Sequence, residues 1–535
     1  MPKDSEATIE FSSLRTDDFD ELGEASKDWD LSYTQLSPGP FNGGIDLVEI
    51  GATQIVREYW GRKIRYQGTA PPGAFAFALP FYPAILILTI FRLPKPIKFR
   101  INDHVFHLSH MIGALRDCCS AFPDRRTGSN CSYTLADIGL SAFSIFFMQS
   151  PSFLSHQRDL HARRNRSNCR TLFGMEKIPC DNHIRTMLDE VAPEHLYGQF
   201  DHLLSYLDEH DGLDSFRRLD GRLPIAFDGT EYFKSRKLSC CNCSHRELRN
   251  GKKEHFHTMV SAAVVSPGDN RVIPLKPEFV TPRDGHEKQD CERAAIKRWL
   301  AAWGESHTPL RPVYLGDDLY ACQPIVEIIQ SLGGDFIFTA KPSSHTTLYE
   351  WLDGAEVNAI EHRYRKGRKK STIRYRWLND LPLRDGKDAV RVNWFAVEII
   401  DAKGKTTYTN SFVTSITISE SNVAELAECG RARWKIENET FNVLKNRGYH
   451  LEHNFGHGDK HLAATLATLN MLAFAMHTIC DTLEALWQEA RKRLGARYRF
   501  FDHIRTIVCY MIFPSWAALM RTLINGQDPR QTGPP

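Results

Sequence analysis

The chain has 535 residues, which is long enough for several domains and a sizeable hydrophobic core. Hydrophobic residues make up 42% and charged residues 25%, as is ordinary for a soluble globular protein. The formal net charge is only +2, so a nucleic-acid partner has to be argued from local patches. Thirteen scattered cysteines and a polar, acidic first segment predict a cytoplasmic protein with reduced thiols and no signal peptide.

Residues 1–100 are rich in glycine and proline, and they predict only an N-terminal extension of unknown role. Within them, residues 74–91 read AFAFALPFYPAILILTIF, an uncharged stretch with the length of a membrane span. Pro80 and Pro83 disfavour a continuous helix there. We therefore expect an irregular or packed apolar segment, with a membrane span as the weaker alternative.

Residues 101–215 predict helices, because apolar residues recur at helical spacing. The pattern is clear in DHVFHLSHMIGALRDCCSAF and in DEVAPEHLYGQFDHLLSYLDEH. Between them, residues 156–170 read HQRDLHARRNRSNCR, with five arginines and one acid. This segment predicts a solvated helix face, and a surface that contacts phosphate is the alternative.

Residues 216–342 predict a mixed α/β region. Strands are expected at LPIAF, where a turn would follow, and at FHTMVSAAVVSP and RVIPLKPEFV, joined by a PGDN turn. An amphipathic helix is expected at DCERAAIKRWLAAWG. A strand, a helix and a strand then follow at PVYLGDD, QPIVEIIQSLGG and DFIFTAKP.

Residues 343–415 alternate like β-strands and predict a β-rich insertion without a buried helix. A long helix is expected over residues 419–446, with its cap near residues 419–421. A second one is expected from Lys460 to Leu494. With these elements, residues 416–480 complete the α/β region, and residues 481–535 form a helical tail.

Acidic residues follow two of the predicted strands. Asp228 ends LPIAF, and Asp317 and Asp318 end VYLG, while Glu437 lies on the long helix. Adjacent acids beside an apolar strand are costly unless a cation compensates them. Converging carboxylates would suit Mg²⁺ or Mn²⁺, which can serve phosphoryl transfer. Ordinary turn aspartates and a solvated helical glutamate are the alternative interpretation.

The segments FDGTEYF, LGDDLY and RWKIENETF together resemble the DDE transposases of bacterial insertion sequences, in the group with a β-rich insertion before the glutamate. The resemblance covers roughly residues 170–480. It implies a ribonuclease-H-like α/β core in which Asp228, Asp317 and Glu437 hold two Mg²⁺ ions. It also implies an N-terminal helical domain at residues 101–215 that recognises the terminal repeats.

The activity implied by the resemblance is cleavage at transposon ends and strand transfer of the freed 3′-hydroxyl to target DNA. The enzyme would act as a homodimer in a synaptic complex, in the cytoplasm beside the nucleoid and away from membranes. A second hypothesis is a decayed or repurposed transposase that binds DNA without cutting it. A third is a zinc-stabilised nucleic-acid module without transposition.

The predicted long helix contains the sequence motif of this group of DDE transposases. Arg433, Glu437 and Lys445 match its arginine, glutamate and lysine in order. Gly430 stands where the group has tyrosine, and Lys445 follows Glu437 by eight residues and not by the usual seven. One residue turns an α-helix by about 100°, so either Lys445 reaches DNA differently or the helix carries a bulge. Arg433 is expected to bind a DNA phosphate, with an ion pair to Glu437 as the alternative.

Strand alternation places Asp317 and Asp318 on opposite faces, but it does not choose between them. The resemblance favours Asp317, because the acid of the group stands three residues before an aromatic residue, here Tyr320. Asp318 is expected to cap the helix that begins near Gln323 or to support the ligand.

Residues 362–376 read HRYRKGRKKSTIRYR, with eight lysines or arginines and no acid. They predict a hairpin whose tip binds the DNA backbone, and a solvated hairpin is the alternative. The residues expected to contact DNA there are Arg365, Lys366, Arg368, Lys369 and Lys370.

Cysteines and histidines gather in SCCNCSHRELRNGKKEHFH. Cys240 and Cys243 form a CxxC pair, and His255 and His257 could complete a tetrahedral structural zinc site. Cys291 could be a further ligand, while core cysteines and a basic loop are the alternative. A second group, His450, His453 and His457, is expected to bind phosphate or cap a turn in preference to a metal.

Overall fold

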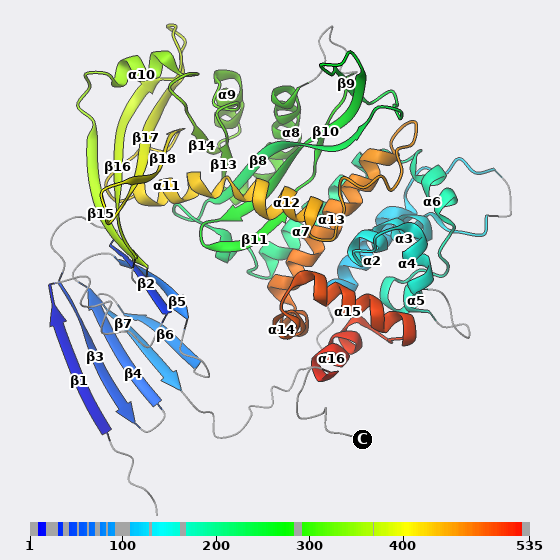
Figure 1. Cartoon of the computed structure of the whole chain (residues 1–535), viewed down its shortest axis with the longest axis horizontal. Helices are drawn as coiled ribbons and strands as arrows, with labels where there is room; N and C mark the ends of the chain where they lie inside the picture. Colours follow the sequence, from blue (N-terminus) through cyan, green and yellow to red (C-terminus); the bar gives the residue numbers. More distant parts are fainter. Residues whose placement is uncertain are drawn as a thin grey trace, which may run out of the picture. The chain divides into compact units, whose positions relative to one another are not determined.

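The computed structural model describes residues 9–17, 30–35, 42–50, 53–60, 64–69, 75–81, 84–90, 107–127, 131–160, 167–282, 291–366 and 369–526. The chain forms two compact units, each built from two separate segments. Met1–Asn102 and Thr339–Glu428 form the first, called here the insertion unit. Asp103–Phe338 and Cys429–Pro535 form the second, called the core unit (Figure 1).

The core unit is a mixed α/β structure built on five strands in the order β11-β10-β8-β13-β14. Strand β10 (Lys253–Ser266) pairs antiparallel with β8 (Leu223–Ser235) on one side and with β11 (Asp269–Pro274) on the other. Strand β13 (Pro312–Gly316) pairs parallel to β8, and β14 (Asp335–Thr339) pairs parallel to β13. Every residue of β13 is buried, which explains its uninterrupted apolar sequence.

The predicted strands of the core unit are present, except that RVIPLKPEFV is divided into β11 and β12 (Glu278–Val280). The expected turn after Phe227 is wrong. Strand β8 runs on through Asp228 to Ser235, because β10 pairs with it from Ile225 to that end. Helix α8 (Glu292–His307) packs on β10 and on α9 (Gln323–Ser331), which crosses over between β13 and β14. Both helices agree with the sequence prediction.

Helices also fill the rest of the core unit. The following helices precede the sheet: α2 (His107–Ser120), α3 (Leu135–Phe147), α4 (Phe153–Leu160), α5 (Asn168–Phe173), α6 (Asp181–Leu188) and α7 (Tyr197–Glu209). Among them, α2, α3, α6 and α7 contact α13 (Leu462–Leu483), drawn in orange in Figure 1. Within the arginine-rich segment, His156 on α4 is buried between Ser144 and Ser150 and not solvated, and residues 161–166 lie outside the described residues.

Helix α13 is the one helix among the described residues that is long and apolar enough to cross a membrane. Its most apolar window is 89% buried, so packing inside the core unit explains its composition. The predicted helix from Lys460 to Leu494 is interrupted at Glu484, which has extended backbone angles. Three shorter helices follow this interruption: α14 (Ala485–Leu494), α15 (Arg497–Tyr510) and α16 (Trp516–Gly526).

The predicted long helix over residues 419–446 is also interrupted. Helix α11 (Val423–Ala432) begins just after the expected cap, since Ser419 accepts the first backbone N–H groups. A π-helix, η4 (Ile436–Phe441), follows, and α12 (Asn442–Asn446) completes the segment. The π-helix packs against β8, β10 and β11.

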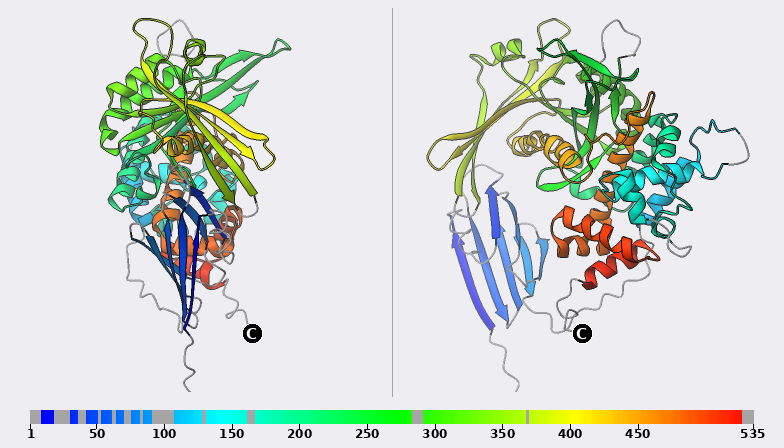
Figure 2. Two further views of the ribbon diagram at one scale, coloured as in Figure 1. Left: turned by 90° about the vertical axis from the view of Figure 1, so that its left-hand side faces the viewer. Right: turned by 45° about the vertical axis from the view of Figure 1, so that its right-hand side comes forward.

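The insertion unit contains an antiparallel meander of four strands, in yellow-green in Figure 2: β15 (Asn358–Lys366), β16 (Lys369–Pro382), β17 (Arg391–Asp401) and β18 (Thr406–Thr414). The β-rich insertion is therefore present. A short helix, α10 (Thr346–Leu352), precedes the meander, but it is not a buried helix, since Leu348 is its one buried residue. Two strands near the N-terminus extend the sheet, as β2 (Asp30–Gln35) pairs with β15 and β5 (Ile64–Thr69) with β2.

A second sheet of the insertion unit comes from the glycine- and proline-rich start of the chain. Its antiparallel order is β1 (Ile9–Thr16), β3 (Gly43–Ile50), β4 (Thr53–Trp60), β7 (Ala84–Ile90) and β6 (Phe75–Phe81). Within the apolar segment 74–91, residues 75–81 and 84–90 thus form paired antiparallel strands and not a helix. Pro80 lies on β6, at the edge of this sheet, where its missing N–H breaks no ladder.

Candidate active site

The site lies in the core unit, where β8 passes the π-helix. Asp228 lies in the middle of β8, and Arg433 precedes the π-helix that contains Glu437. The Arg433 guanidinium contacts Asp228 Oδ2 at 3.4 Å and Glu437 Oε1 at 2.8 Å. One cation therefore bridges two of the three predicted acids, although they are far apart in the sequence.

Asp228 is the most strongly perturbed acid of this group. Burial raises its pKa to about 7, against the opposing effects of the Arg433 charge and the Gly229 N–H. The charges of Asp317 and Glu437 raise it further, which places both acids near Asp228. Arg433 alone thus does not compensate this carboxylate, and a further cation would stabilise its charged form.

Asp317 follows the last residue of β13 and belongs to the same group of acids. Its Oδ1 accepts the backbone N–H of Leu319 at 2.8 Å. The N-cap residue of α9 is Cys322, and the capping or supporting role expected of Asp318 stays a prediction.

Glu292, in the first turn of α8, is a fourth acid that the sequence interpretation missed. A Cβ atom placed on Gly229 would lie 2.2 Å from Glu292 Oε1, so this carboxylate touches the backbone beside Asp228. Burial raises the pKa of Glu292, and the Asp317 charge adds to the effect. In the sequence Glu292 is one of several acids in RDGHEKQDCERAA, and only the packing of α8 on β10 distinguishes it.

Tyr320 lies buried among these acids. Burial is the largest cause that raises the pKa of Tyr320, and the charges of Glu292, Asp228 and Asp317 raise it further. Its ring meets that of Phe227 edge-on at 4.7 Å, and its hydroxyl has no hydrogen-bond partner among the described residues. The apolar ring thus helps to desolvate the carboxylates around it.

The donor set fits a hard divalent cation, because it consists of carboxylate oxygens around a half-buried position. Among the described residues, only a Cys/His group has three or more possible ligand atoms all within 4.8 Å of one another. The carboxylates are therefore set wider apart, and the Arg433 guanidinium lies between Asp228 and Glu437. A metal shared by these two acids would compete with that guanidinium.

Lys445 lies on α12, beyond the π-helix, and its Nζ pairs with Glu452 at 2.9 Å. A π-turn takes up one more residue than an α-turn, because its N–H bonds a carbonyl five residues back. An eight-residue step through a π-turn is therefore close to a seven-residue step along an α-helix. The bulge considered from the sequence is present, and it lies between Glu437 and Lys445.

The predicted basic hairpin forms in the insertion unit, with Lys366 opposite Lys369 and Arg365 opposite Lys370. The tip, with Arg368, and the side chains of residues 365–370 lie outside the described residues. Further along, Arg374 pairs with Glu361 at 2.8 Å and with Glu398 at 3.2 Å. Acids on neighbouring strands thus neutralise part of the basic segment, and DNA contact at its tip stays a prediction.

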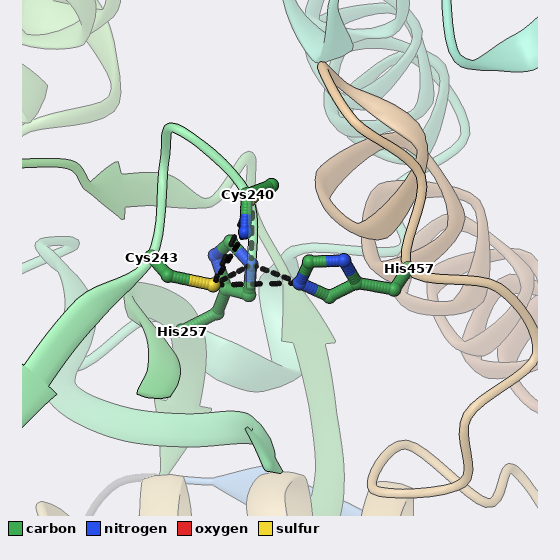
Figure 3. Close-up of side chains that lie close together, drawn as sticks. All are labelled: Cys240, Cys243, His257 and His457. Atoms are coloured by element: carbon green, nitrogen blue, oxygen red, sulfur yellow. Dashed lines mark hydrogen bonds between the residues drawn. The ribbon is translucent and has the colours of Figure 1, made fainter. Parts of the chain in front are cut away.

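The predicted zinc residues divide into two sets. Cys240, Cys243 and His257 lie together, and His457, from the loop before α13, takes the fourth place (Figure 3). His255 lies outside this group, with its ring 6.4 Å from that of His245, and Cys291 is the N-cap residue of α8. The local sequence does not predict His457 as a ligand of this group, because His457 is 200 residues from His257.

Comparison with known families supports the resemblance found in the sequence. Residues 246–475 match the family model described as transposase DDE domain. The match contains Asp317, Arg433 and Glu437 and begins after Asp228, which the fold brings to the same place. No curated protein matches the chain at a significant level. The matched domain supports a DDE transposase of the insertion-sequence type.

Proposed function

We propose that the protein is a DNA transposase that cleaves DNA at the ends of its element and joins the freed 3′-hydroxyl to target DNA. The observation that carries the proposal is that Arg433 contacts both Asp228 and Glu437, with the Asp317 charge close to Asp228. Of these residues, Asp317, Arg433 and Glu437 lie within the matched transposase DDE domain. No residue of this group is a typical covalent nucleophile. The attacking group would be water in cleavage and a DNA 3′-hydroxyl in strand transfer.

We propose further that the five strands of the core unit form a ribonuclease-H-like core. Three antiparallel strands followed by two parallel ones place Asp228 on the central strand and Asp317 at the end of its parallel neighbour. Adjacent parallel strands hold these two acids at a fixed separation. The π-helix packs on β8 and supplies Glu437.

Asp228, Asp317 and Glu437 would hold Mg²⁺ or Mn²⁺, with Glu292 beside them. Such ions, when bound, activate the attacking oxygen and stabilise the leaving one in phosphoryl transfer. Ionisation of Asp228 is required for this role, and its raised pKa makes that ionisation dependent on a nearby cation. Arg433, once released from its carboxylates, has the planar donor geometry to bind a DNA phosphate.

DNA is the proposed partner. Lys445 would contact the backbone beside the catalytic group, and Arg365, Lys366, Arg368, Lys369 and Lys370 would contact it from the hairpin of the insertion unit. The helical region 101–215 would recognise the terminal repeats, in a homodimeric synaptic complex in the cytoplasm beside the nucleoid.

The test is cleavage of DNA that carries the ends of the protein's own element, with Mg²⁺ or with EDTA. We expect Mg²⁺-dependent strand cleavage that Asp228→Asn, Asp317→Asn and Glu437→Gln each abolish. Asp318→Asn is the matched control next to Asp317, and it should keep most of the activity. Equal cleavage by wild type and Asp228→Asn would overturn the proposal. Specific DNA binding without cleavage by the wild type would favour the decayed transposase.

A further inference from the structure

Four side chains of the core unit bring two sulfur and two nitrogen atoms together (Figure 3). The two sulfurs, of Cys240 and Cys243, lie 3.8 Å apart, and the His257 and His457 Nε2 atoms lie 3.2 Å apart. His257 Nε2 lies 3.5 Å from the Cys240 sulfur and 3.3 Å from the Cys243 sulfur, and His457 Nε2 lies 3.4 Å from the latter.

These distances match the edges of a zinc tetrahedron. With Zn–S bonds of about 2.3 Å and Zn–N bonds of about 2.05 Å, ideal tetrahedral angles give about 3.8 Å between sulfurs, about 3.6 Å from sulfur to nitrogen and about 3.3 Å between nitrogens. We propose that Cys240, Cys243, His257 and His457 bind one structural Zn²⁺. This proposal does not depend on the proposed DNA chemistry.

A disulfide and a purely hydrogen-bonded cluster both account less well for these four side chains. The Sγ atoms are far beyond the roughly 2.05 Å of a disulfide, and both cysteines are free. Hydrogen bonding alone is insufficient as well. Each of the four atoms carries at most one hydrogen, yet five close contacts join them. A single cation at the centre satisfies all four ligand atoms at once.

The type of site follows from its ligands and its burial. Four protein ligands leave no position for substrate, which is the mark of a structural zinc site. Cys243 and His257 are buried, and Cys240 and His457 are half-buried. The backbone N–H of Cys240 also donates to the Cys243 sulfur at 3.4 Å, a contact that would stabilise a thiolate there.

The location of the four ligands indicates which parts of the core unit the zinc would connect. The cysteines belong to the loop between β8 and β9 (Ser244–Glu247), and His257 lies on β10. His457 belongs to the connection from α12, which follows the π-helix of Glu437, to α13. The ion would fasten this connection to the β8–β10 part of the sheet that carries Asp228.

Elemental analysis of the untagged, full-length protein tests the proposal. We expect about one zinc per chain after gel filtration without added metal, and a severalfold loss in Cys240→Ser and in His457→Ala. The matched controls are Cys241→Ser and His255→Gln, whose residues lie nearby in the sequence but outside the group. Asp228→Asn should keep its zinc, which separates this site from the carboxylates.

A second measurement keeps the test valid if the ligand variants do not fold. Zinc-depleted wild-type protein with Co²⁺ should show the visible spectrum of tetrahedral cobalt with thiolate ligands, and added Zn²⁺ should remove it. A folded wild type without zinc and without this spectrum would overturn the proposal, as would equal zinc loss in Cys241→Ser. Zinc content is measured without DNA, so failure here is distinct from failure of the proposed transposition.

Discussion

Replacing Gly229 by alanine tests whether Glu292 takes part in the catalytic group. The added Cβ would lie 2.2 Å from Glu292 Oε1 and 2.3 Å from its carboxyl carbon. Ordinary contacts of this kind begin near 3.4 Å, so the carboxylate must retreat by more than 1 Å. Glu292 is a flexible side chain and can move, while alanine suits a strand better than glycine. The substitution therefore displaces one acid and leaves the ligands Asp228, Asp317 and Glu437 unaltered in sequence.

We expect Gly229→Ala to lower the rate of DNA end cleavage by about 10- to 100-fold, as is typical when a residue that orients metal ligands is displaced. The unfolding midpoint should change little, since no buried apolar contact is lost. Glu292→Gln, which keeps the shape of the side chain but removes its charge, should lower the rate to a similar extent. The rate is measured under single-turnover conditions with saturating Mg²⁺.

A double-mutant cycle decides how the alanine acts. If it acts through Glu292, then adding Gly229→Ala to Glu292→Ala should cause no further loss of rate. An equal loss in both backgrounds would mean that the alanine disturbs Asp228 directly, and the reasoning would be refuted. Full activity of all three variants would exclude Glu292 from the catalytic group.

Three further outcomes are expected. Deletion of Asn438 should convert the π-turn into an α-turn and keep the cleavage activity. An alanine inserted after Asn438 should instead rotate Lys445 by about 100° and abolish the cleavage activity. Equal loss of activity in both variants would contradict this explanation. Tyr320→Phe should leave cleavage unchanged and the unfolding midpoint unchanged or higher, because the hydroxyl has no partner among the described residues; a loss of cleavage would show that the hydroxyl serves the reaction. Burial raises the pKa of Glu484 to about 7, against the effect of the Leu108 N–H, so the folded protein holds this proton more tightly than the unfolded chain. Ionisation of Glu484 therefore lowers the stability of the folded protein as the pH rises from about 4.5 to 7. Glu484→Gln should stabilise the protein by up to about 3 kcal/mol at pH 8 but not at pH 4.5. Thermal unfolding at the two pH values measures this difference, and a gain in stability that is independent of pH would contradict it.

The sequence predicted those elements whose burial is fixed by their own residues. Strand β13 is buried at every residue and reads as an apolar run, and α8 buries one face and reads as an amphipathic helix. The sequence did not predict that β8 continues past Asp228, because the length of β8 depends on how far β10 pairs with this strand. The break at Glu484 escaped prediction for a similar reason, since its carboxylate accepts the N–H of Leu108 on a distant helix.

Sequence proximity misled the choice of zinc ligands in the same way. The CxxC pair and His257 are close in the chain and form one side of the group. The local sequence predicts His255 as the fourth ligand, whereas His457 reaches the group through the connection between α12 and α13. Nothing in the local pattern around His457 separates it from His450 and His453.

The π-helix explains how a departure from the family pattern is compatible with the same chemistry. An extra residue between Glu437 and Lys445 would turn the lysine away in a regular α-helix. The π-turn absorbs that residue at the site itself, and π-turns are often found at functional sites. Lys435 holds the start of this turn, since its buried ammonium donates to the Asp269 carbonyl at 2.8 Å. Because this anchor and the Arg433 bridge both lie at the start of the irregular turn, the position of Glu437 depends on contacts with β8 and β11 and not on the regularity of its own helix.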